Sequence, residues 1–331
     1  MTKGGSRIGS GRKPKPFSEK KESLLISLDP QVARWLRQRP RYSRLVNNLL
    51  TMEMSRSIVR ETTKHESQDS EQVRIAILSN SGGAGKSTLC HNIAYNLNRL
   101  GKSTLLLDLD PQHNLDLFCG LTSTKKVGTM LDVFAENFQG NYPIVQIEGR
   151  QTSIIRGCNE LQRVQQELVL RRRREQVLAD LFVDYPLKYD VILMDCPATL
   201  GLVIDNAIAS ATHLLIPLVP EGKAVQGLNG LFDTIEKIGR DLRLNPRPTV
   251  LGIVPVGYDK DTASHRQAIA AFKSRCDYVG VELFEPITDS KEVKNANEAG
   301  KPIGIYRPGH KSSLEFQQLT KLLFDKIYGK T

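Results

Sequence analysis

Residues 73–89, VRIAILSNSGGAGKSTL, decide the fold of this chain. A short apolar run at 75–78 ends in a glycine-rich turn, and the GKS triplet at 85–87 then opens a helical pattern. The order of strand, glycine loop and helix is what distinguishes a phosphate-binding loop from an incidental GKS match. Glycines tolerate the backbone angles at which successive N–H groups converge on an anion, and the following helix directs its N-terminus at the same anion.

Individual residues of this loop have expected roles. Lys86 is expected to reach the β- and γ-phosphates, and the Ser87 hydroxyl is expected to bind Mg²⁺. Asn80 stands where the common spacing has its first glycine, and the pair Gly82-Gly83 indicates a variant of the loop. The predicted nucleotide-binding residues are Ser81, Gly82, Gly83, Ala84, Gly85, Lys86, Ser87 and Thr88.

Two more apolar runs end in acidic residues. Leu105–Leu107 leads to Asp108 and Asp110, and Val191–Met194 leads to Asp195. In a phosphate-binding-loop enzyme, an acidic residue at such a strand end holds Mg²⁺. The predicted magnesium site therefore combines Ser87 with Asp108 and Asp195.

These motifs together resemble the ParA/MinD family of deviant Walker ATPases. The family loop reads K-G-G-x-G-K-[ST], its second motif D-x-D-P-Q, and its third D-C-P-P-s-L-G. The matching segments of this chain are residues 81–87, residues 108–112 and residues 195–201, with Ala198 in place of the second proline. Residues 213–228, 258–262 and 298–308 resemble later family segments, so the resemblance covers about 72–330.

The resemblance implies a function as well as a fold. Members of this family are Mg²⁺-dependent ATPases that bind two ATP molecules in a sandwich homodimer, and Asp110 matches the residue that helps to orient the attacking water. The ATP-bound dimer binds DNA non-specifically, and a ParB-like or adaptor protein stimulates hydrolysis. The candidate DNA contacts in the C-terminal part are Lys291, Lys294, Lys301 and Arg307.

One departure from the family concerns its signature lysine, which is Ser81 here. That lysine contacts the nucleotide of the partner subunit, and a serine is too short and uncharged to do so. Lys223, in the loop after the apolar run 214–219, is the candidate replacement in catalysis. Two alternatives are that Lys223 is an ordinary exposed loop residue and that Lys86 suffices. Some cargo-positioning relatives in this family, such as those that space carboxysomes, also resemble this variant with serine in place of the lysine.

The first fifth of the chain is strongly basic. Residues 1–70 hold 15 Lys and Arg against 7 Asp and Glu, out of 46 and 36 in the whole chain. Such asymmetry suggests a nucleic-acid-binding arm or module. Residues 1–19 are expected to form a flexible tail in which Arg12 and Lys13 either follow a DNA minor groove or only aid solubility.

Residues 20–55 have the pattern of one strand and two helices. The unit resembles a ribbon-helix-helix DNA-binding module, in which a dimer pairs two strands into a ribbon that enters the major groove. The outward residues of that ribbon are Lys21, Ser23, Leu25 and Ser27. The alternative is a helical dimerisation or adaptor element with a basic face. Residues 56–71 are polar, lack periodicity and are expected to form a linker.

Residues 72–331 are expected to form the ATPase domain, an α/β fold with a mostly parallel sheet covered by helices on both faces. Helices are predicted over 86–99, 127–134, 159–182 and 313–328, and the third of these is either continuous or interrupted. The arginines at 171–174 would lie on the third of these, either on a solvated face or in contact with DNA or a partner. The last helix is expected to pack on the domain and not on a membrane.

The rest of the sequence limits the setting of the protein. The five cysteines are scattered without a C-x-x-C pair, which gives metal ligation little support and suits a reducing compartment. No apolar run approaches the ~20 residues that span a bilayer. We therefore expect a cytoplasmic, nucleoid-associated protein without membrane contact.

These features favour DNA partition, such as plasmid segregation, with an N-terminal module that adds sequence-specific binding. Two alternatives stay open at this point. One is an ATPase that positions a protein cargo, and the other is a transcriptional repressor regulated by ATP.

Overall fold

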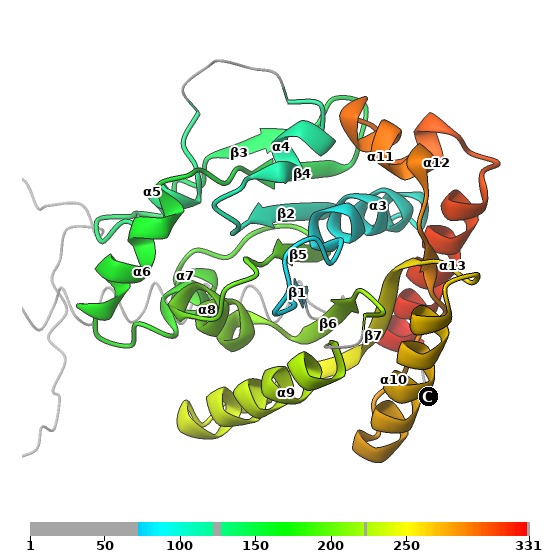
Figure 1. Cartoon of the computed structure of the whole chain (residues 1–331). Helices are drawn as coiled ribbons and strands as arrows, with labels where there is room; N and C mark the ends of the chain where they lie inside the picture. The colour runs from blue at the N-terminus through cyan, green and yellow to red at the C-terminus, as the bar shows by residue number, and fades with distance from the viewer. Residues whose placement is uncertain (1–71, 122–126, 222–223, 330–331) are drawn as a thin grey trace, which may run out of the picture. The chain divides into compact units, whose positions relative to one another are not determined.

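The computed structural model describes residues 72–121, 127–221 and 224–329, and these residues form an α/β domain built on one sheet (Figure 1). Eight strands of the described chain pair in the order β3-β4-β2-β5-β1-β6-β7-β8. Every pairing is parallel except that of β3 with β4. The predicted fold class of this domain is confirmed. The predicted tail, ribbon-helix-helix module and linker at 1–71 lie outside the described residues.

The strands are short, apart from β7. Their bounds are β1 Val73–Ile77, β2 Thr104–Asp108, β3 Ile144–Gln146, β4 Thr152–Ile155, β5 Val191–Asp195, β6 His213–Leu218, β7 Thr249–Tyr258 and β8 Ile287–Thr288.

The helices connect the strands and continue to the C-terminal end of the described chain. Their bounds are α3 Lys86–Arg99, α4 Asn114–Phe118, α5 Met130–Val133, α6 Leu161–Val169, α7 Val177–Asp184, α8 Leu202–Ser210, α9 Ala224–Asp241, α10 Ala263–Val279, α11 Lys291–Glu298, α12 Ile303–Tyr306 and α13 Lys311–Tyr328.

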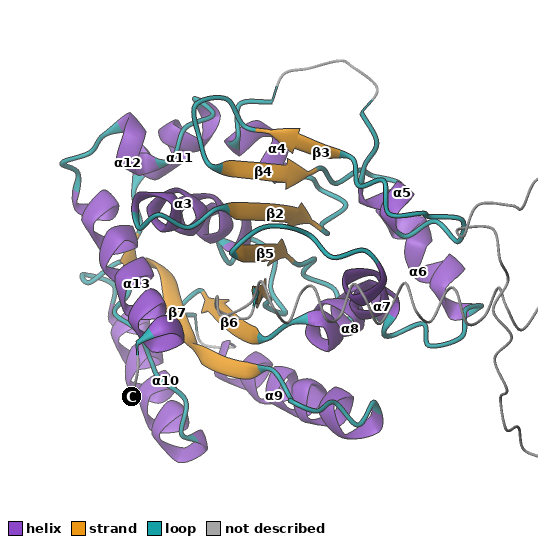
Figure 2. Ribbon diagram, turned by 180° about the vertical axis from the view of Figure 1, so that it is seen from behind, coloured by secondary structure: helices purple, strands orange, loops and turns teal. Residues whose placement is uncertain are grey.

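The central strands are apolar throughout because both faces of the sheet are covered. Alternate residues of β5 point to opposite faces, so that Val191 and Leu193 join one core cluster while Ile192 and Met194 join the other. The first cluster also takes side chains from α3 and α13, and the second from α6, α8 and α9. Figure 2 shows these helices arranged around the sheet. Parallel strands buried on both faces give the unbroken apolar runs seen in the sequence.

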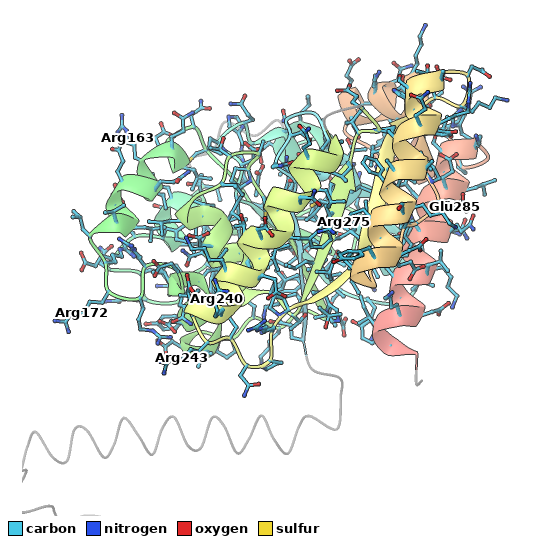
Figure 3. All side chains as sticks on the ribbon, turned by 60° about the horizontal axis from the view of Figure 1, so that its bottom comes forward. Arg163, Arg172, Arg240, Arg243, Arg275 and Glu285 are labelled. Carbon is cyan, nitrogen blue, oxygen red and sulfur yellow. The ribbon has the colours of Figure 1, made fainter. Side chains whose placement is uncertain are left out.

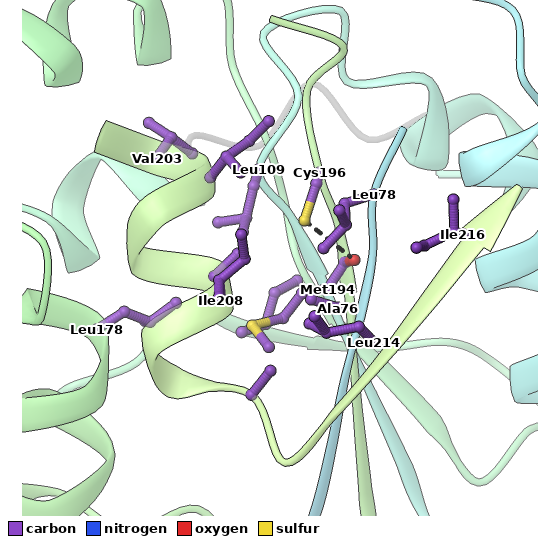
Figure 4. Packing of buried hydrophobic residues seen from close by; sticks show 14 of the residues in the cluster. Ala76, Leu78, Leu109, Leu178, Met194, Cys196, Val203, Ile208, Leu214 and Ile216 are labelled. Atoms are coloured by element: carbon purple, nitrogen blue, oxygen red, sulfur yellow. Dashed lines mark hydrogen bonds between the residues drawn. The ribbon is translucent and has the colours of Figure 1, made fainter. Parts of the chain in front are cut away.

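The core on the α8 side is packed closely beneath the β5 end of the sheet (Figure 4). Met194 of β5 lies between Ala76 of β1 and the Ile208 side of α8, and the Cys196 thiol donates a weak hydrogen bond to the Met194 carbonyl at 3.7 Å. Cys196 is thus a buried packing residue. The five cysteines, all within the described residues, form no disulfide there.

Three predicted helices have different bounds in the structure. The helix expected at 127–134 is only the single turn α5, which starts after the capping residue Thr129. The helix expected at 159–182 is two helices, α6 and α7, separated by a turn. The last helix, α13, begins at Lys311, two residues before its predicted start, and packs on α3 as expected.

The break between α6 and α7 corrects the placement of the four arginines. Arg171–Arg174 do not lie along a helix but in the turn, where Arg173 has a φ of 53°. Arg173 holds Asp180 of α7 through two hydrogen bonds of 2.8 and 2.9 Å. Arg172 points away from the domain at the edge of this turn (Figure 3). The four side chains therefore act separately and not as one helical face.

Candidate nucleotide-binding site

The glycine loop joins the end of β1 to the start of α3 as predicted. Gly83 and Gly85 have φ values of 72° and 74°, which residues other than glycine rarely adopt. A Cβ atom at Gly85 would also lie 2.8 Å from a methyl carbon of Val256. Glycine is therefore required at 85 for two reasons, and the loop amides are free to line an anion site at the N-terminus of α3.

Lys86 is the first residue of α3 and its side chain folds back into the loop. The residue is only 6% exposed, and its Nζ donates a hydrogen bond to the Ser81 carbonyl at 3.3 Å. A buried ammonium held against one carbonyl is available to an incoming anion. This geometry agrees with the predicted role of Lys86 at the phosphates.

Asp108 and Asp195 lie side by side at the carboxyl ends of β2 and β5, where the strand register pairs them directly. Both are fully buried. Burial, and next the charge of Asp195, raise the pKa of Asp108 well above its usual range. Burial also raises the pKa of Asp195 to about 7, an effect that the nearby Ser87 hydroxyl opposes.

The oxygens of this carboxylate pair fit a cation site. Neither oxygen of Asp195 has a hydrogen-bond partner among the described residues, and Oδ2 of Asp108 has none either. Magnesium is bound in proteins through one or two carboxylates together with water and substrate phosphates. The Ser87 hydroxyl lies near Asp195, and the strand register pairs Asp195 with Asp108, so these three residues could hold such an ion together. The described residues contain no cluster of three His, Cys, Asp or Glu side chains with metal-binding geometry.

Asp110 is more open than Asp108, although only two residues separate them. Its Oδ1 accepts a hydrogen bond from the Gln112 amide at 2.9 Å, and its own amide donates to Asp108 at 3.2 Å. Gly157, in the loop after β4, packs directly against this turn. A Cβ atom at Gly157 would lie 2.9 Å from the Asp108 carboxyl carbon, so a larger residue would clash there. The sequence did not single out Gly157, and no local motif marks it.

A cavity of about 590 Å³, here called the phosphate cavity, opens beside the loop. Its walls include the loop residues 82–88 and Asp110, which are among the predicted site residues, whereas the predicted Ser81, Asp108 and Asp195 do not line it. The walls also include Gln112 and Thr199, which lie within the motifs at 108–112 and 195–201 but were not named as site residues. The sequence did not indicate the other wall residues, Asn114, Phe118, Leu161, Gln162, Gln165 and Val203, and nothing in it pointed to α6.

A second cavity of about 360 Å³, here called the second cavity, lies on the other side of the loop. Gly83, Gly85 and Thr88 border both cavities. Its remaining walls come from the ends of β6, β7 and β8 and from α10, α11 and α13, and they include apolar Val256 and Ile287. The polar residues of these walls are Glu221, His265, Thr288, Asp289, Ser290, Lys294 and Asn297. Of these, only Lys294 was among the predicted site residues, and it was expected to contact DNA.

Asn80, which replaces the first glycine of the common motif, has a structural role. Its side-chain amide donates to the Gly227 carbonyl of α9 at 2.7 Å, and a Cβ at Gly227 would lie 2.8 Å from the same amide. Asn80 thus ties the start of the glycine loop to the start of α9. The side chain of Ser81, at the position of the family lysine, lies 3.2 Å from the Ser79 hydroxyl.

The four predicted DNA-contacting residues of the C-terminal part are exposed on one segment, which covers α11 and α12. Lys294 forms an ion pair with Asp289 at 3.2 Å and Arg307 one with Glu292 at 3.0 Å. Exposed pairs of this kind contribute little to stability and exchange readily with other anions. Lys223, Arg12, Lys13, Lys21, Ser23, Leu25 and Ser27 lie outside the described residues. No described helix is long and apolar enough to cross a membrane.

Comparisons with known proteins show the family of this chain. The family profile AAA_31, described as an AAA domain, matches residues 72–247. The chromosome partitioning protein ParA of Myxococcus xanthus is 31% identical over 235 residues, which is 70% of this chain and 81% of that protein. The chain therefore belongs to the ParA/MinD-type family of P-loop ATPases.

Solved structures share the fold at lower identity. A Cyanothece McdA–ATP complex matches with a TM-score of 0.69 and 21% identity, covering 80% of this chain and 100% of that one. Cobyrinic acid a,c-diamide synthase of Mycobacterium smegmatis, with a bound ATP analog and magnesium, matches with a TM-score of 0.65 and 22% identity, covering 78% and 98%. The ligands of these neighbours, ATP or its analog and magnesium, are those that the sequence of this chain predicts.

Proposed function

We propose that this protein is a Mg²⁺-dependent ATPase that hydrolyses ATP to ADP and phosphate. One observation carries the proposal: Lys86 and Ser87 of the glycine loop lie near the buried carboxylate of Asp195, which the strand register pairs with Asp108, and Asp110 is on the cavity wall. Bound magnesium would neutralise phosphate charge as the transition state forms. Lys86 and the loop amides hold the phosphates, and Asp110 orients the attacking water.

The second cavity is the proposed place of the nucleotide base. It begins at the same three loop residues as the phosphate cavity, so one ligand can occupy both. Apolar walls at Val256, Ile287 and Val293 suit the faces of a purine ring, while Asp289 and Ser290 can meet its polar edge.

The biological role that we propose is ATP-dependent partition of DNA, as in plasmid segregation. The ParA protein of Myxococcus xanthus, named a chromosome partitioning protein, supports this role. ATP would bring two subunits together, and the dimer would bind DNA through the exposed cations of the segment 291–307. A ParB-like or adaptor protein would then stimulate hydrolysis and release the DNA.

Positioning of a protein cargo is the second candidate. Ser81 favours it, because the cargo-positioning relatives resemble this chain at that place, and McdA shares the fold. Loss of cargo distribution in a deletion strain with normal plasmid inheritance would select this candidate over partition.

Two substitutions test the enzymatic proposal. Lys86→Ala should abolish ATP binding, because the ammonium contacts phosphate in the ground state. Asp110→Ala should keep ATP affinity and slow hydrolysis by about 10²-fold or more, since positioning of the water acts in the transition state. Fluorescent-nucleotide titration and phosphate release measure the two effects. Wild-type turnover in Asp110→Ala would remove its assigned role.

A further inference from the structure

A line of polar side chains connects α3, which begins at the glycine loop, with the segment that carries α11 and α12. The Asn297 side chain of α11 donates to the Thr88 hydroxyl at 3.1 Å. On the same face, Arg150 of the β3–β4 hairpin lies 2.9 Å from Nε2 of His91 and also donates to the Gly300 carbonyl at 3.1 Å. Arg150 therefore bridges α3 and the C-terminal end of α11.

The contact with Arg150 determines the form of His91. A guanidinium can only donate, so Nε2 of His91 is the acceptor and Nδ1 carries the proton. Burial and the charge of Arg150 lower the pKa of His91 to about 3, which keeps the ring neutral near pH 7. The Nδ1–H group points away from Arg150 and needs an acceptor of its own.

That acceptor lies close by but is not engaged. Nδ1 of His91 and Oδ1 of Asn297 are both buried, and neither has a hydrogen-bond partner among the described residues. They are neighbours that interact only weakly: Asn297 raises the pKa of His91 against the effect of burial, as a hydrogen-bond acceptor does, but the two atoms do not meet full hydrogen-bond geometry. Unpaired buried groups are unfavourable, and a small movement of α11 toward α3 would pair this donor with this acceptor.

The C-terminal end of α11 packs against another loop, whereas its N-terminal end is exposed to solvent. Gly300 has a φ of 66°, and a Cβ there would lie 2.5 Å from Cα of Gly120, so the backbones of the two loops are in direct contact. Lys291 and Lys294, at the other end of α11, are exposed. A movement that pairs Asn297 with His91 would therefore turn the start of α11 about Gly300.

Two residues of this polar line, Thr88 and Asn297, border the proposed nucleotide site. Thr88 borders the two cavities, and Asn297 borders the second cavity. We propose that Arg150, His91 and Asn297 are positioning residues, which place the segment 289–307 according to whether the nucleotide site is filled. The inference rests on the proposed nucleotide binding. Its consequence is that the exposed cations of this segment are accessible to DNA in one of the two states, nucleotide site filled or empty, and less accessible in the other.

Hydrogen–deuterium exchange on the full chain, with and without ATP and Mg²⁺, tests the proposal. We expect ATP to change exchange in 289–307 of the wild type by about 5-fold or more. Arg150→Ala and His91→Leu should remove this change while ATP affinity stays within about 2-fold of wild type. Arg172→Ala, an exposed arginine in the α6–α7 turn, is the matched control and should keep the change.

The outcomes separate this inference from the proposed function. No ATP-dependent change at 289–307 in a wild type that binds ATP would overturn it, as would a change that persists in both Arg150→Ala and His91→Leu. A wild type that shows the change but no ATP-dependent binding to a DNA duplex would leave the inference standing and remove the DNA-binding role. Failure of the wild type to bind ATP would overturn both.

Discussion

Asp108 and Asp110 are neighbours in one short motif, yet the fold gives them different environments. Asp108 is the last residue of β2 and is fully buried, whereas Asp110 reaches the wall of the phosphate cavity. The difference arises because the strand ends between them and the chain turns outward. The Asp108 carboxylate can therefore face a cation at the edge of the sheet, while the Asp110 carboxylate faces the solvent in the cavity.

Asp205 gives a prediction on the dependence of stability on pH. Burial, and next the charge of Glu175, raise its pKa to about 6, so the folded state disfavours the ionised form. The penalty is absent below about pH 4, grows between about pH 4 and 6, and is complete above about pH 6. Since the group is partly solvated, Asp205→Asn should stabilise the protein by only about 1 kcal/mol at about pH 8.

Urea denaturation at about pH 8 and at about pH 5 measures the effect of Asp205→Asn. The gain should be clearly smaller at the lower pH, because wild-type Asp205 is then mostly protonated in the folded state. An equal gain at both pH values would mean that the substitution acts through packing and not through charge.

The loop and strand-end residues could be predicted because short motifs carry them. Lys86, Ser87, Asp108 and Asp195 each follow an apolar run, and parallel strands bring such ends to one edge. Gly157 and the wall residues of α6 could not be predicted, since their roles come from contacts between segments far apart in the sequence. Their local sequence would suit any exposed loop or helix.

At the scale of elements, helix ends provide a clear test. Helix α9 closes with the Arg243 amide bonded to the Arg240 carbonyl and the Leu244 amide bonded to the Gly239 carbonyl, at 3.1 and 3.0 Å. This is a Schellman ending, which places Arg243 at a φ of 50°. Arg243 is exposed, on the same side of the domain as Arg240 (Figure 3). Glycine is the residue that such a position favours.

Arg243→Gly should therefore stabilise the domain by about 0.5–1 kcal/mol, because it relieves the left-handed conformation at little cost in contacts. Gly280, which ends α10 with a φ of 70° and has open space around it, allows the reverse change. Gly280→Arg should destabilise by a similar amount. Thermal melts of both variants measure this pair, and a destabilised Arg243→Gly would show that the arginine makes contacts worth more than the strain.

Element prediction succeeded where a long periodic run was present and failed at short elements. Helix α3 has its predicted bounds, 86–99, because the glycine loop determines its start and Gly101 follows its end. Strands β3 and β8 are too short to show an alternation that can be recognised. An interruption of the helix expected at 159–182 was allowed for, but its position at 170–176 was not predicted, because these residues, mostly arginines, are good helix formers and tertiary packing of α7 overrides that preference.

At the scale of the whole molecule, Ser81 raises the question of how two nucleotides could face each other in a dimer. If Lys223 supplies the missing cation, Lys223→Ala should lose ATP-dependent dimerisation but keep most of the ATP affinity of the monomer. Light scattering with ATP, in an Asp110→Ala background that slows hydrolysis, measures the dimer. An undiminished dimer population would exclude Lys223 as the replacement.

The N-terminal part gives a prediction that does not depend on ATP. If residues 20–55 read DNA sequence, the full chain carrying Lys86→Ala should still bind a specific duplex from DNA flanking its own gene. Adding Lys21→Ala and Ser27→Ala should weaken that binding. Fluorescence anisotropy against a scrambled duplex is the measurement, and affinity independent of sequence would reduce this part to a basic tether. Repression that persists with Lys86→Ala would favour the repressor alternative.

The order of the strands has a consequence for how the protein is made. Strands β1 and β2 are not neighbours in the sheet, because β5 lies between them. A nascent chain on the ribosome must therefore expose the apolar faces of β1 and β2 until β5, which ends at Asp195, has emerged long after β2 ends at Asp108. The ATP site cannot assemble before that point, so chaperones have a long interval in which to bind the unfinished sheet.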